Sequence, residues 1–87
     1  MRQDVTALMD DCAHLQHAAP FGSRWRHRRS GGVYVVQGVC VLEANQKAAV
    51  LYRNTEGGPV WARNGREFLD GRFERVVQRF DTKEKQK

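Results

Sequence analysis

The stretch VYVVQGVCVL, from Val33 to Leu42, holds the longest β-branched run in the chain and predicts a β-strand. Ser30-Gly31-Gly32 precedes it as a turn signal, and the alternating segment from Arg24 to His27 precedes that turn, so the two segments predict a β-hairpin. Gly38 interrupts the longer strand near its middle. Glycine in that position is typical of a bulge or a sharp bend, as at the corner of a small barrel.

The residues after this hairpin predict three more short strands. In the first of them, Ala48, Val50 and Tyr52 share one face and the residues between them share the other. A single helical turn that buries Phe68 and Leu69 is expected before the last strand, which follows the turn signal Asp70-Gly71. The expected ranges are 48–53, 60–63 and 72–77 for the strands and 64–69 for the helical turn.

An amphipathic helix is predicted at the start of the chain. Apolar residues recur at helical spacing over 4–17 and form one stripe, at Val5, Leu8, Met9, Cys12 and Leu15. Pro20 and Gly22 end the helix because proline cannot continue its hydrogen-bond ladder. The predicted organisation is therefore a helix over 1–20, a small β-domain over 21–80 and a disordered charged tail over 81–87, which has no apolar residue.

These elements predict a mainly β fold, α+β by content. About five short strands with a glycine bend favour a small SH3-like half-open β-barrel, with the N-terminal helix across one open end. A four-stranded meander with a packed helix is the alternative.

Length and composition limit the function further. Eighty-seven residues support a single small core, and no apolar run reaches the length of roughly 18 residues that a membrane span needs. Residues 1–20 contain three aspartates and lack the apolar centre of a secretory signal, so we expect a cytoplasmic protein. The two cysteines, Cys12 and Cys40, lie in apolar patterns and do not predict a disulfide framework.

The net charge of +5 is concentrated in the middle of the chain. Ten of the eleven basic residues between 21 and 80 are arginines, whose planar guanidinium suits contacts with phosphate or carboxylate. This bias indicates an anionic partner. Positive charge also serves solubility, and the charge by itself does not separate the two interpretations.

A candidate binding site follows from Arg24-Trp25-Arg26-His27-Arg28-Arg29. In a strand, Arg24, Arg26 and Arg28 share one face, where they can neutralise phosphates, and nearby aromatic rings can stack on bases. The alternative is an edge strand whose arginines block pairing and whose tryptophan is in the core. Further along the chain Tyr52, Arg53, Trp61 and Arg63 could extend the candidate surface, although Tyr52 and Trp61 are more typical of core positions.

Catalytic and metal-binding patterns are weak in this sequence. Cys12, His14 and His17 point in different directions around a helix, so they predict no metal site. Cys40 lies within a strand without a base fixed by sequence, and no pair of carboxylates has a fixed spacing. We expect a protein without enzymatic activity and without a cofactor.

The β portion resembles a known family. The motifs are Trp25-Arg26-His27, the run from Gly32 to Val39, Val50 to Arg53, Trp61-Ala62-Arg63 and Phe68 to Phe73, all between residues 24 and 76. They are similar to the bacterial and phage domain-of-unknown-function family 1653. The resemblance implies a small β-barrel and a phage or prophage setting, and it implies no particular activity.

Together these observations predict a non-catalytic module that binds an anionic partner, nucleic acid or a nucleotide, through the arginine-rich strand and adjacent aromatic residues. The alternative is a phage or prophage inhibitor that binds a host protein, such as a defence protein, or sequesters a nucleotide signal. The sequence leaves the oligomeric state open.

Overall fold

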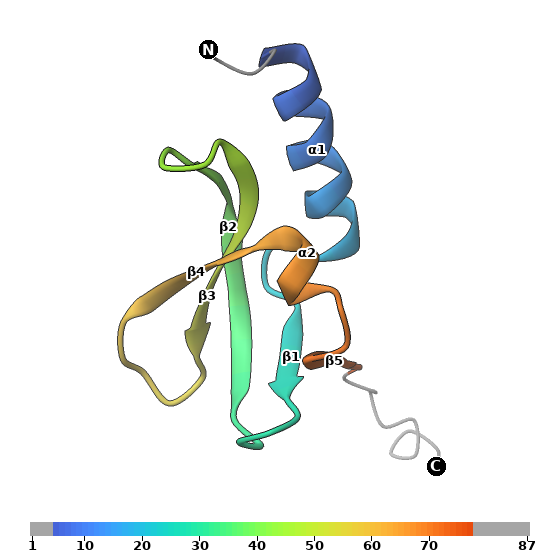
Figure 1. Ribbon diagram of the computed structural model, residues 1–87. Helices are drawn as coiled ribbons and strands as arrows, with labels where there is room; N and C mark the ends of the chain where they lie inside the picture. Colours follow the sequence, from blue (N-terminus) through green and yellow to red (C-terminus); the bar gives the residue numbers. More distant parts are fainter. Residues whose placement is uncertain (1–4, 78–87) are drawn as a thin grey trace.

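β2 (Val33–Leu42) is the central strand of a five-stranded antiparallel sheet in the computed structural model, which describes residues 5–77 (Figure 1). The strand order is β4-β3-β2-β1-β5. The other strands are β1 (Arg24–His27), β3 (Lys47–Asn54), β4 (Val60–Asn64) and β5 (Phe73–Val76). The mainly β class and the five strands are confirmed, and the four-stranded alternative is wrong. The predicted charged tail over 81–87 lies outside the described residues.

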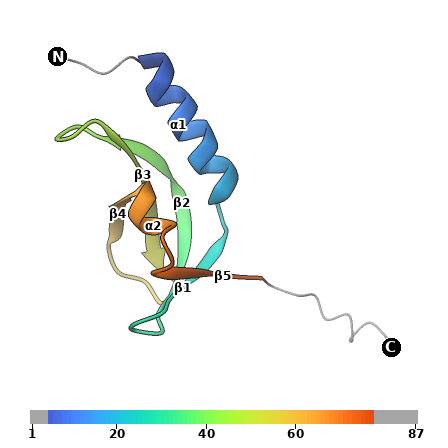
Figure 2. The same ribbon diagram turned by 45° about the vertical axis from the view of Figure 1, so that its right-hand side comes forward.

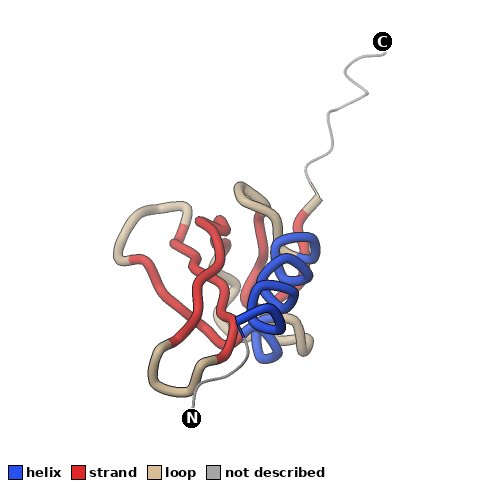
Figure 3. Tube along the Cα trace, turned by 90° about the horizontal axis from the view of Figure 1, so that it is seen from above, coloured by secondary structure: helices blue, strands red, loops and turns tan. Residues whose placement is uncertain are grey.

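The sheet is open. Within residues 5–77, β4 and β5 are its two edges and share no ladder, so the structure does not show a closed barrel. Seen from above, the strands curve round a common interior (Figure 3). β1 is an interior strand because it pairs with β2 on one side and β5 on the other. The edge-strand interpretation of its arginines is therefore wrong.

Gly38 marks a bulge in β2, as predicted. The register of β2 with β3 shifts between Val36 and Gly38, so Gln37 is the extra residue on the β2 side. Gly38 has φ +150°, a conformation that side chains disfavour. The bulge bends the longest strand and lets the sheet curve.

α1 (Val5–Ala18) lies against β2 and β3 through its C-terminal half (Figures 1 and 2). Leu15 and Ala19 are buried, whereas Val5 and Met9 at the other end are exposed. The predicted apolar stripe is thus only partly buried, because the beginning of the helix projects past the sheet (Figure 1). None of the described helices is long and apolar enough to cross a membrane.

The core is aromatic and lies between the sheet and the helices. Phe68, at the end of the one-turn helix α2 (Gly65–Phe68), is completely buried. Its ring stacks on Phe73 at 4.4 Å between centroids and meets Trp25 at 5.1 Å. Leu69 is exposed, which corrects the prediction that it shares this burial, because the helix ends at Phe68 and Leu69 is already its C-cap.

Candidate functional site

The sheet divides the candidate site residues between two faces. We call the face that carries the core and the helices the inner face, and the opposite one the outer face. Cross-strand partners in an antiparallel sheet lie on the same face, so the register assigns each residue. Trp25, His27, Tyr52, Trp61 and Arg63 lie on the inner face, Arg24, Arg26, Arg28 and Arg53 on the outer face, and Arg29 in the β1–β2 turn.

Four arginines gather on the outer face and are called the outer arginine surface: Arg24, Arg26, Arg28 and Arg53. Arg24 and Arg53 both pair with Val35, from the strands on either side of it. Arg26 and Arg28 both reach the carboxylate of Glu74 on β5, at 3.2 and 3.4 Å. The predicted alternation along β1 is therefore confirmed, because its arginines share a face and Trp25 points to the core.

Only part of this surface is neutralised by neighbouring groups. Glu74 is one carboxylate between two guanidinium groups. The Arg53 side chain donates from Nε to the Gly58 carbonyl at 2.8 Å, an interaction that leaves its charge uncompensated. Arg24, which like Arg53 pairs with Val35, is exposed. The outer arginine surface thus keeps a positive excess.

Apolar residues separate the outer arginines. Val35 stands between Arg24 and Arg53, and Val76 and Val60 extend the same row onto the two edge strands. Val60 is half exposed. The outer face is therefore a mixed surface of arginine and valine.

Two of the predicted stacking residues are buried instead. Trp25 is 8% exposed and Tyr52 is 6% exposed, and both belong to the core. Trp25 donates from Nε1 to the buried Ser23 hydroxyl at 3.0 Å, and the Arg75 guanidinium lies over its ring. Both rings lie on the inner face and therefore offer no stacking surface beside the outer arginine surface. Trp61, by contrast, is 52% exposed and can offer one.

A small pocket of about 290 Å³ opens on the inner face and is called the aromatic pocket. Each of the five strands contributes to its wall. The ring contacts within it join Tyr34 to Tyr52 at 5.3 Å, Tyr52 to Phe73 at 5.4 Å and His27 to Phe73 at 5.0 Å. The lining residues are His27, Ser30, Tyr34, Tyr52, Trp61, Arg63 and Phe73.

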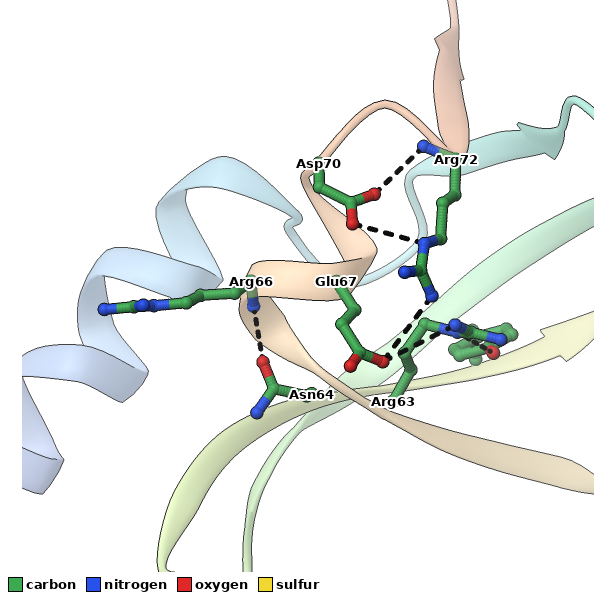
Figure 4. Close-up of polar contacts among 7 residues, drawn as sticks. Arg63, Asn64, Arg66, Glu67, Asp70 and Arg72 are labelled. Atoms are coloured by element: carbon green, nitrogen blue, oxygen red, sulfur yellow. Dashed lines mark hydrogen bonds and ion pairs between the residues drawn. The ribbon is translucent and has the colours of Figure 1, made fainter.

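Arg63 is the cation of the aromatic pocket, and its position is fixed from three sides. Its Nε donates to the Tyr52 hydroxyl at 3.2 Å, and its guanidinium lies 5.8 Å from the Phe73 ring centroid. Glu67 of α2 lies 3.6 Å from Arg63 and 3.7 Å from Arg72 and bridges the two (Figure 4). The hydrogen bond to Tyr52 raises the pKa of Arg63, so this group stays cationic.

His27 adds a second donor to the aromatic pocket. The backbone N–H of Ser30 donates to His27 Nδ1 at 3.3 Å, a contact that favours the tautomer with its proton on Nε2. The Ser30 hydroxyl lies 3.0 Å from the same Nδ1. Together Arg63 and His27 give the pocket polar groups that donate hydrogen bonds.

Metal-ligating side chains do not cluster within residues 5–77, and the Cys40 thiol there has a raised pKa. No cluster of three or more His, Cys, Asp or Glu side chains able to hold a metal ion occurs within residues 5–77. Burial, with a smaller effect from Cys12, raises the pKa of the Cys40 thiol. A raised pKa lowers the thiolate fraction, and the thiolate is the nucleophile.

Comparisons with known proteins found no match: no family model, no curated protein and no solved structure is similar to this chain. The resemblance to family 1653 stays a prediction. The site is therefore argued from its own residues.

Several residues of the candidate site were not predicted from the sequence. Tyr34, Ser30 and Phe73 line the aromatic pocket, and Glu74 pairs with the outer arginines. Tyr34 belongs to the predicted strand, and its alternation with Val33 and Val35 was a usable signal. Phe73 and Glu74 depend on the β1–β5 pairing between distant segments, which no local pattern reveals.

Proposed function

We propose that this protein is a non-catalytic module that binds nucleic acid through the outer arginine surface. The observation that carries the proposal is the concentration of Arg24, Arg26, Arg28 and Arg53 on one sheet face beside the single carboxylate of Glu74. Guanidinium groups on neighbouring strands can contact successive phosphates and release their counterions. Under this proposal the curved sheet is an SH3-like half-open barrel whose outer face is the binding surface.

Salt dependence measures this interaction directly. Each lost phosphate contact lowers the slope of log affinity against log salt by roughly 0.7 to 0.9. The double variant Arg24→Ala/Arg53→Ala removes two guanidinium groups that have no carboxylate partner among the ion pairs of residues 5–77. We expect weaker binding to a labelled oligonucleotide and a slope flatter by roughly 1.4 to 1.8.

The chain offers a matched control for this variant. Lys47→Ala/Arg66→Ala removes the same charge from two exposed residues in the groove between α1, α2 and β3, away from the outer arginine surface. The control should keep most of the slope. Equal losses in both double variants would show that net charge alone drives binding, and absence of salt-dependent binding by the unmodified protein would reject the proposal.

A second candidate function follows from the valines between the arginines. Val35, Val60 and Val76 give the outer face an apolar component that phosphate contacts do not use. A protein partner with acidic and apolar side chains complements such a surface. This candidate corresponds to an inhibitor of a host protein. It predicts that nuclease treatment of a lysate leaves a specific protein bound and that Val60→Ser releases it.

A further inference from the structure

The aromatic pocket combines flat apolar walls with hydrogen-bond donors. Tyr34, Tyr52 and Phe73 form the walls through edge contacts with one another, and Trp61 lines the same pocket with about half of its surface exposed. The volume of about 290 Å³ lies at the lower limit for small-molecule sites. A pocket of this size accepts one planar ring system.

The charge in the aromatic pocket selects among planar ligands. Aromatic cages bind cationic groups when the ring faces are free, but here the Arg63 guanidinium already lies 5.8 Å from the Phe73 ring centroid. A cationic ligand would meet this fixed positive charge. A neutral or anionic ring is favoured, and it should carry hydrogen-bond acceptors for the donors of Arg63 and His27.

The β1–β2 turn adds cations beside the aromatic pocket. Arg28 and Arg29 lie between His27 and Ser30, two residues of the pocket wall. Arg29 is exposed, and the backbone N–H of Arg28 donates to the carbonyl of Arg72, the residue before β5, at 2.9 Å. A ring held in the pocket can therefore carry a phosphate that reaches this turn.

From these features we infer that the aromatic pocket binds one unpaired nucleobase, stacked on Trp61 and hydrogen-bonded through its acceptors to Arg63 and His27. Carbonyl oxygens and ring nitrogens supply those acceptors on a nucleobase, and every base has a face that stacks. The base can come from a free nucleotide or from a single strand. This site is on the inner face, so it does not require Arg24 or Arg53, the two outer arginines that the salt-dependence test removes.

The test compares two single-stranded oligonucleotides of equal length, one of thymidines and one of abasic residues. Both carry the same phosphates, and only the first offers bases. We expect the thymidine strand to bind more tightly, and Trp61→Ala to weaken its binding roughly tenfold or more, the effect of losing one stacked base. Binding of the abasic strand should not respond to Trp61→Ala.

Trp61→Phe is the matched control, because it keeps an aromatic face at an exposed position. It should retain most of the affinity that Trp61→Ala loses. Titration with nucleoside monophosphates then separates the sources: saturable, Trp61-dependent binding identifies a free nucleotide as a ligand, and binding by the strand alone identifies a base within a chain.

The inference is overturned if Trp61→Ala leaves the binding of the thymidine strand and of every monophosphate unchanged. That outcome differs from failure of the proposed function, which is measured by Arg24→Ala/Arg53→Ala. If Trp61→Ala has no effect while Arg24→Ala/Arg53→Ala still lowers the salt slope, the protein binds nucleic acid through the outer arginine surface without the aromatic pocket. A Trp61 effect without an arginine effect leaves the aromatic pocket as the binding site.

Discussion

The same strands build the inner and outer faces of this sheet, but the inner face is buried and aromatic, whereas the outer face carries exposed arginines. On β1, Trp25 faces inward into the aromatic core, and its neighbours Arg24 and Arg26 face outward. The inner face holds the fold together by burying rings, whereas exposed guanidinium groups on the outer face contribute little to stability. One strand with alternating residue types therefore contributes to the core and to the proposed binding surface, and substitutions on the two faces should separate stability from binding.

The largest expected effect on stability is at the centre of the inner face. Phe68 is fully buried and contacts the rings of Trp25, Tyr52 and Phe73. Phe68→Ala should lower the free energy of unfolding by about 3 to 5 kcal/mol, measured by urea denaturation, because a cavity replaces the ring. Phe68→Leu should retain the fold with a smaller loss. A loss under about 1 kcal/mol for the alanine variant would mean that the core is not organised around this ring.

A smaller effect is expected where β2 bends. Gly38 has φ +150°, and a Cβ added there would meet no atom within 4 Å, so the penalty of a side chain is conformational and not steric. Gly38→Val should lower the free energy of unfolding by roughly 1 kcal/mol or more. Gln37→Val, at the extra residue of the same bulge, is the control and should be milder. If Gly38→Val has no effect on the melting temperature, the strand can run straight and the curvature has another origin.

The smallest change in stability is expected on the outer face. Glu74→Gln breaks two exposed ion pairs, with Arg26 and Arg28, and should change the free energy of unfolding by less than about 1 kcal/mol. Oligonucleotide binding should become stronger and its salt dependence steeper, because two guanidinium groups lose their carboxylate partner.

Glu43→Gln is the matched control for that prediction. Glu43→Gln changes the net charge by the same amount as Glu74→Gln. Glu43 is exposed and directly follows β2, at the end away from the β1–β2 turn, so this change is made far from Arg26 and Arg28. If both variants strengthen binding to the same extent, the ion pairs with Glu74 do not regulate the outer arginine surface.

Local patterns predicted the elements well and their packing only in part. The β-branched run of β2, the glycine turn before it and the alternation along β1 each depend on near neighbours in sequence, and the structure confirms all three. The burial of Leu69 was predicted wrongly because helical spacing alone does not show where a one-turn helix ends. The stacking role given to Trp25 failed for a related reason, since alternation assigns a face and does not tell whether that face is covered.

The site required information that no local pattern holds. The aromatic pocket collects residues from every strand, and Phe73 reaches His27 only through the pairing of β1 with β5. Arg63 was predicted to extend the arginine-rich surface, but it lies on the inner face, and its partners Tyr52 and Glu67 come from β3 and α2. The order of the strands in the sheet determines which of these residues meet, and local sequence patterns do not predict that order.

The pairing of β1 with β5 also determines when this sheet can be complete during synthesis. Arg24 pairs with Val76, so this ladder closes a loop that spans most of the sheet and must form after the local β2–β3 hairpin. A nascent chain that has not yet reached Phe73 has β1 as an unpaired edge and lacks a ring of the core. β5, the last strand within residues 5–77, thus brings the aromatic pocket and the carboxylate of Glu74 into place together, and a chain that stops before Phe73 holds neither.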